Sequence, residues 1–62
     1  MAMNRTSQHQ AKIDILLEHR KVMISYLRHK MQLEDWHGVQ DAGSDLREID
    51  TELRVLRDLS DV

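Results

Sequence analysis

The chain has 62 residues, of which 40% are apolar, with no cysteine, no proline and two glycines. A chain this short forms one domain, here residues 1–62, and buries too little of its surface to be very stable by itself. Without cysteine it has neither disulfides nor a thiolate zinc site, which are common stabilising devices at this size. We therefore expect the chain to be stabilised as a homodimer.

The net charge of −2 is distributed unevenly. Residues 1–33 carry six lysines and arginines against two acids, and residues 34–62 carry three arginines against nine acids. Complementary charge predicts that the two halves pair with each other; the alternative is that the basic half faces an anionic partner. No apolar run is long enough to cross a membrane, and residues 1–10 lack the apolar core of a signal peptide. We therefore expect no membrane association and a cytoplasmic protein.

Residue preferences favour helix nearly throughout and give no strand signal. Residues 1–6 show no pattern and are expected to be disordered. Ser7 and Gln10 have the spacing of a capping box, which predicts a first helix over about 8–33.

A second helix is predicted over about 36–59. Asp35 is a suitable N-cap for this helix, because its carboxylate can accept a hydrogen bond from the first turn. The turn between the helices is then expected at about 34–35.

The apolar residues of each helix recur at alternating steps of three and four, the spacing of a heptad seam. The series is out of phase by one residue between Met31 and Val39, which indicates a turn rather than one long helix. The numbers of facing seam residues add up to 69 or 70 throughout, as in an antiparallel pair. The predicted fold is an all-α antiparallel two-helix hairpin. Its expected core is Ile13, Leu17, Ile24, Leu27, Met31, Val39, Ala42, Leu46, Ile49, Leu53 and Leu56.

One seam position of the first helix carries Arg20 instead of an apolar residue. Its guanidinium either reaches an acid of the second helix or meets a partner's carboxylate at the opening of a dimer. The acids considered for the first role are Asp45, Glu48 and Glu52.

Apolar residues outside the seam make the first helix too broadly apolar for one partner helix. We expect them to form a dimer interface, so that two hairpins make a four-helix bundle with the first helix at its centre. The alternative is that some of them remain exposed. The residues assigned to the dimer interface are Leu16, Val22 and Met23.

No arrangement of residues predicts catalysis, a metal site or a cofactor. His9, His19 and His29 recur every ten residues, so no two share a helix face, and His37 has no histidine or cysteine four residues away. A two-helix hairpin also offers no cavity that could exclude water from a reaction. We expect a chain that is not an enzyme.

A basic side of the first helix suggests nucleic-acid binding as the alternative function. The acidic total charge and the single Tyr and single Trp argue against it, because nucleic-acid binders usually carry a strongly basic surface with aromatics among the charges. We favour a protein partner. The candidate nucleic-acid face consists of Lys12, Lys21, Arg28 and Lys30.

Three stretches carry a family resemblance that covers about residues 13–57. They are Tyr26-Leu-Arg-His-Lys-Met, Glu34-Asp-Trp-His-Gly-Val-Gln-Asp-Ala and Asp45-Leu-Arg-Glu-Ile, with Asp35-Trp-His-Gly-Val and Asp45-Leu-Arg as the most specific pieces. The chain resembles small early proteins of lambdoid temperate phages, encoded between the exonuclease and excisionase genes. The resemblance implies a short helical regulator without enzymatic activity. It further implies a protein that biases infection toward lysis through protein partners in the host bacterial cytoplasm.

Aromatic and apolar residues near the turn form the expected partner site. Met and Trp side chains suit an adaptable groove for an amphipathic helix. We predict a cleft formed by Tyr26, Leu33 and Trp36, with Met23 or Met31 at its base; alternatively these residues complete the dimer core.

Overall fold

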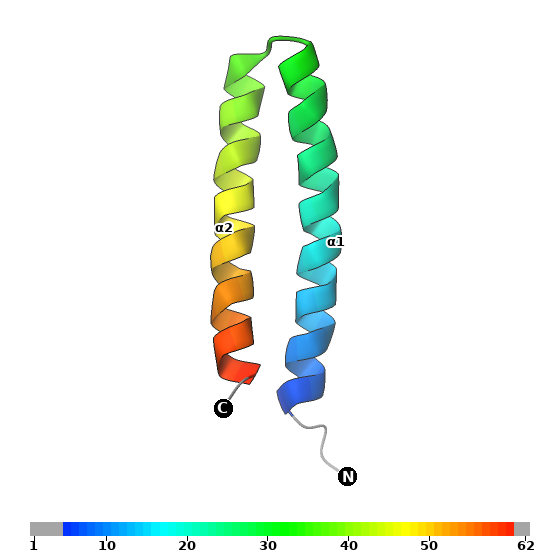
Figure 1. Ribbon diagram of the computed structural model, residues 1–62, viewed down its shortest axis with the longest axis vertical. Coiled ribbons are helices and arrows are strands. Elements are labelled where there is room, and N and C mark those ends of the chain that lie inside the picture. Colours follow the sequence, from blue (N-terminus) through cyan, green and yellow to red (C-terminus); the bar gives the residue numbers. More distant parts are fainter. Residues whose placement is uncertain (1–4, 61–62) are drawn as a thin grey trace.

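The chain folds into two long antiparallel helices joined by a short turn (Figure 1). The computed structural model describes the backbone of residues 5–60 and the side chains of residues 8–59. Helix α1 spans Arg5–Gln32 and helix α2 spans Trp36–Ser60. The prediction of an all-α antiparallel hairpin is confirmed.

The start of α1 differs from the prediction. The helix begins at Arg5 rather than near residue 8, so Ser7 lies within the first turn instead of capping it. Nothing among residues 5–7 breaks a helix, since none is glycine or proline. The expected disorder of residues 1–6 is contradicted at its last two positions, and the remainder of that segment lies outside the described residues.

The turn is a Schellman motif, the backbone arrangement that commonly ends a helix. The Asp35 amide donates to the Lys30 carbonyl at 2.9 Å, and the Glu34 amide donates to the Met31 carbonyl at 3.0 Å. This pattern needs a left-handed residue, which is Glu34 with a φ of 56°. Glycine usually fills this position, which explains why the sequence carries no obvious turn signal.

The seam of α2 lies at the heptad positions that the sequence indicates. Every one of these positions is buried or half-buried, and the three toward the carboxyl end together with Ala42 form the most buried set. They are Val39, Ala42, Leu46, Ile49, Leu53 and Leu56.

The seam of α1 is rotated by one position from the prediction. Leu16 and Met23, not Leu17 and Ile24, pack against the buried cluster of the hairpin. Leu17 and Met31, both predicted as core, are 38% and 50% exposed, so these two assignments were wrong. The buried and half-buried positions that follow the heptad spacing are Ile13, Leu16, Arg20, Met23, Leu27 and Lys30.

The rotation has a physical cause. Apolar residues flank this seam of α1 on both sides, so the spacing of apolar residues within α1 fits more than one phase. The phase is set by α2, whose apolar stripe is narrow and unambiguous. Ile24, half-buried, remains at the edge of the seam.

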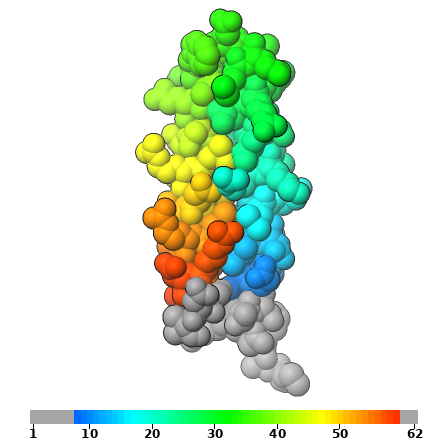
Figure 2. Space-filling model, viewed as in Figure 1, coloured from blue at the N-terminus to red at the C-terminus, as the bar shows by residue number. Residues whose placement is uncertain are grey.

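The buried core is concentrated in the half of the hairpin away from the turn. Ile13 of α1 lies with Ile49, Leu53 and Leu56 of α2 in one cluster. Nearer the turn, the buried seam residue is the small Ala42, whose side chain is completely buried. Side chains largely fill the space between the two ribbons along the length of the hairpin (Figure 2). This packing orients the remaining surface of each helix.

Candidate functional site

One carboxylate at the turn has two partners. Asp35 Oδ1 accepts a hydrogen bond from the Gly38 amide at 3.1 Å, which caps α2 as the sequence predicts. Its other oxygen, Oδ2, lies 3.3 Å from Lys30 Nζ, and this ammonium sits 5.2 Å from the centre of the Tyr26 ring. Lys30 is therefore part of the turn rather than a free surface cation.

These contacts shift two pKa values in opposite directions. The Gly38 amide, followed by the Lys30 ammonium, lowers the pKa of Asp35. The Asp35 carboxylate, followed by the Tyr26 phenol, raises the pKa of Lys30. Both shifts favour the charged pair, so the turn is held in one electrostatic state around neutral pH.

The seam also divides the hairpin into two broad faces. In an antiparallel pair, residues one position before the seam residues of both helices lie on one side, and residues one position after them lie on the other side. Arg20 and Asp50 illustrate the register, since Arg20 Nε lies 2.9 Å from Asp50 Oδ1 across the two helices. This pair also corrects the sequence prediction, which placed other acids opposite Arg20.

The first face, which we call the acidic face, carries four acids and one lysine. Its residues in α1 and the following turn are Lys12, Ile15, His19, Val22, Tyr26, His29 and Leu33. Its residues in α2 are Gly38, Asp41, Asp45, Glu48, Glu52, Val55 and Leu59. The six large apolar residues on this face are between 45% and 68% exposed.

The second face, which we call the basic face, carries five lysines and arginines against two acids. Its residues in α1 are Asp14, Leu17, Lys21, Ile24, Arg28 and Met31. Its residues in α2 are Trp36, Gln40, Gly43, Arg47, Asp50, Arg54 and Arg57. Trp36, at the start of α2, is 63% exposed.

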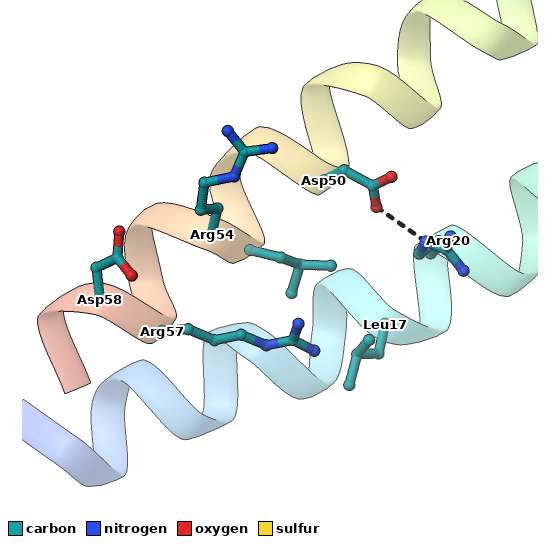
Figure 3. Close-up of a pocket in the computed structure, with 7 residues that line it drawn as sticks. Leu17, Arg20, Asp50, Arg54, Arg57 and Asp58 are labelled. Atoms are coloured by element: carbon teal, nitrogen blue, oxygen red, sulfur yellow. Dashed lines mark hydrogen bonds and ion pairs between the residues drawn. The ribbon is translucent and has the colours of Figure 1, made fainter. Parts of the chain in front are cut away.

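An open groove of about 470 Å³ lies along the basic face, away from the turn (Figure 3). Arg57 extends from α2 across the groove toward α1, whereas Arg54 points away from α1. Neither arginine forms an ion pair within the part of the chain that the structure describes. The groove is lined by Leu17, Arg20, Asp50, Leu53, Arg54, Arg57 and Asp58.

The predicted dimer interface is corrected by this arrangement. Leu16 and Met23 belong to the hairpin seam, where they pack against the buried cluster of the same chain. Only Val22 of the three assigned residues is exposed, and it lies on the acidic face.

The predicted partner cleft does not form as one site. Tyr26 and Leu33 lie on the acidic face, whereas Trp36 lies on the basic face by its heptad position. Met23 is packed in the seam and cannot form the base of a cleft between them. Met31, the alternative base, is 50% exposed and lies on the basic face. All three proposed wall residues are exposed, but their heptad positions place them on two different faces.

The predicted nucleic-acid residues are also separated. Lys21 and Arg28 follow one edge of α1 on the basic face, Lys12 lies on the acidic face, and Lys30 is held in the turn. Lys21 pairs loosely with Glu18 at 3.7 Å. Three arginines of α2 lie on the same face as Lys21 and Arg28. Adding up the charges by halves of the chain does not reveal this grouping. Counting charges by heptad position would have found this grouping.

Residues 5–60 contain no group of three or more His, Cys, Asp or Glu side chains placed to hold a metal ion. Neither described helix is both long and apolar enough to span a membrane. Comparison of the chain with protein-family models, curated proteins and solved structures finds no match.

Proposed function

We propose that this chain is a non-catalytic interaction protein that works as a homodimer of helical hairpins, a four-helix bundle, and binds another protein. The observation that carries the proposal is the exposure of large apolar side chains on both faces. Five apolar residues are buried in the described hairpin, while nine large ones are exposed. A surface this apolar on so small a chain is typical of association sites.

The resemblance to small early proteins of lambdoid phages supports a more specific proposal. We propose an early regulator that biases infection toward lysis in the cytoplasm of a bacterial host. The physical properties of the hairpin are compatible with this role, since a regulator of this kind needs binding surfaces and no reaction centre.

A nucleic-acid-binding bundle is the second candidate. The observation that favours it is the gathering of Lys21, Arg28, Arg47, Arg54 and Arg57 on one face. Phosphate contacts by such a face would make affinity fall steeply with salt, whereas burial of apolar surface is much less sensitive.

The dimer is tested by sedimentation equilibrium at micromolar concentration. We expect a species of twice the 7.3 kDa chain mass. A folded species of the mass of one chain would contradict the homodimer.

The partner class is tested by capture from a bacterial lysate and by gel shift with nucleic acid, each at about 50 and about 200 mM salt. A protein retained at the higher salt concentration supports the first candidate. A gel shift lost at that concentration, and lost also in an Arg54→Glu, Arg57→Glu variant, supports the second. Lys12→Glu, which reverses a charge on the opposite face, is the control for each of these two substitutions made singly.

A further inference from the structure

We propose that a second copy of this chain covers the acidic face, with α1 of each hairpin packed antiparallel against α2 of the other and both turns at the same end. This inference rests on the proposed homodimer and specifies its interface and its orientation. The inference is argued from the distribution of charged and apolar residues over the two faces.

The distribution of apolar residues selects the face. The acidic face exposes six large apolar side chains, whereas the basic face exposes three. The basic face would also bring the cations Lys21, Arg28 and Arg54 of two copies together, and like charges at an interface oppose association. On the acidic face the apolar residues occur near both ends of the hairpin, as Ile15, Val22, Tyr26, Leu33, Val55 and Leu59.

The distribution of charge selects the orientation. All four acids of the acidic face lie on α2, and its only lysine and both of its histidines lie on α1. A dimer that placed α2 on the partner's α2 would set the acids Asp41, Asp45, Glu48 and Glu52 against the same four acids. A dimer that places α1 on the partner's α2 instead sets three of these acids at the height of histidine or tyrosine side chains. The fourth acid, Glu48, then lies at the height of the partner's Val22.

The levels of the two helices agree with this orientation. When both turns are at the same end, a residue of α1 lies level with the same residues of the partner's α2 as of its own α2. Within one hairpin this register is given by Arg20, which lies opposite Asp50. Ile15 then lies at the height of the partner's Val55, and His19 at the height of the partner's Glu52. His29 lies at the height of the partner's Asp41, and imidazole N–H groups can donate to such carboxylates.

The size of the face is sufficient for a stable dimer. The 25 residues of α2 extend about 38 Å at about 1.5 Å per residue, and two helices of about 10 Å diameter make a face of roughly 750 Å². Standard protein interfaces bury about 800 Å² on each partner. Both basic faces, with their grooves, remain on the outside of the resulting bundle.

The choice of face is tested with two variants matched in exposure. Val22→Glu places a charge in the proposed interface, and Met31→Glu places the same charge on the basic face; the two original side chains are 58% and 50% exposed. We expect Val22→Glu to weaken dimerisation by about tenfold or more, which corresponds to about 1.4 kcal/mol, and Met31→Glu to change it less than about twofold. Equal effects, or a larger effect of Met31→Glu, would overturn the assignment of the face.

The orientation is tested by spin labelling, for which the absence of cysteine in the chain is convenient. A single His37→Cys label reports on the turn end, and a single Glu18→Cys label reports on the middle of the hairpin; both side chains are largely exposed. In the proposed dimer both labels give distances below about 35 Å, as expected for a bundle of helices about 10 Å across with label arms added.

The three possible outcomes separate the inference from the proposed homodimer. Short distances from both labels support the inference. A short distance from Glu18→Cys with a distance of about 40 Å or more from His37→Cys, as set by the length of α2, leaves the homodimer intact and overturns the orientation. The absence of any distance between subunits from both labels overturns the homodimer and this inference together.

Discussion

Glu34 occupies the left-handed region at the end of α1, with a φ of 56°. The hydrogen bond from the following amide, that of Asp35, to the Lys30 carbonyl requires this conformation. A residue with a Cβ pays steric strain there that glycine does not, of about 1–2 kcal/mol. Within the described residues, the turn between the two helices therefore carries backbone strain at Glu34.

We predict that Glu34→Gly increases the free energy of unfolding by up to about 1 kcal/mol, because relief of strain exceeds the greater entropy of glycine in the unfolded chain. Urea denaturation at fixed protein concentration measures the change. Glu34→Ala is the control, since it removes the carboxylate and keeps the Cβ. An equal gain from both variants would show that charge, not backbone strain, matters at this position.

The two glycines of α2 make different contacts. A Cβ on Gly38 would lie 2.8 Å from Lys30 Cδ and 3.2 Å from Asp35 Oδ2, whereas a Cβ on Gly43 would meet nothing within 4 Å. Gly38 makes room for the Lys30 side chain as it reaches Asp35. Gly43 has no comparable role in the isolated hairpin.

Replacing each glycine by alanine should separate helix preference from packing. Gly43→Ala is expected to stabilise the protein by about 1 kcal/mol, the usual difference between the two residues within a helix. Gly38→Ala should give little or no net gain, because the same helix preference is offset by displacement of Lys30 from its ion pair. Thermal unfolding followed by circular dichroism compares the two variants, and equal gains would contradict the tight packing at Gly38.

At the scale of the elements, the turn joins the ends of both helices through Asp35 and Lys30. The lowered pKa of Asp35 means that its contribution is complete above the ordinary pKa of an aspartate, about 3.9, and is lost as the pH falls through the lower folded value. The raised pKa of Lys30 means that its contribution is complete below 10.5 and is lost as the pH rises through the higher folded value.

Asp35→Asn should therefore flatten the acid side of the stability profile. Asparagine keeps an N-cap acceptor for α2 but does not titrate. We expect the fall in melting temperature between about pH 5 and pH 2 to be smaller in this variant than in the parent chain. Asp58→Asn, which alters an exposed acid of α2 outside the proposed interface, is the control. A fall as steep as that of the parent chain would exclude Asp35 as a source of acid sensitivity.

The phase of α1 is the second feature at this scale, and it can be tested with adjacent leucines. Leu16→Ala removes a side chain that packs against the buried cluster, and should lower the free energy of unfolding by about 2 kcal/mol. Leu17→Ala alters a residue that is 38% exposed and should cost less than about 1 kcal/mol. Equilibrium urea unfolding of both variants measures the two changes. A larger loss of unfolding free energy from Leu17→Ala would show that Leu17, rather than Leu16, lies in the seam, as the sequence alone indicated.

At the scale of the whole molecule, the hairpin has a small core and much exposed apolar surface. If association contributes to stability, as we propose, unfolding is coupled to dissociation and its midpoint depends on concentration. We predict that the melting temperature rises by several degrees when the protein concentration is raised about a hundredfold, since mass action then adds about 2.7 kcal/mol. Scanning calorimetry or circular dichroism measures it; a constant midpoint would indicate a monomeric hairpin.

The sequence by itself determined the two helices, their antiparallel order and the seam of α2. The helices and the seam of α2 depend on local preferences and on one narrow apolar stripe, as with Ala42, Ile49 and Leu53, so one chain segment contains the necessary information. The antiparallel order followed from the break in phase between Met31 and Val39. It also identified Asp35 as the cap of α2, because capping is a contact within a few residues.

Only the tertiary structure decided the phase of α1, the partner of Arg20 and the division of charge between two faces. Apolar residues on both sides of the α1 seam allow several phases, and the choice among them depends on packing against residues about 30 positions away, as the contact between Arg20 and Asp50 shows. The same choice places Lys30 in the turn and Leu16 in the core. Along the chain, basic residues concentrate in the first half and acidic residues in the second half. Antiparallel packing regroups these charges into two faces, because each face is made of one edge of α1 and one edge of α2.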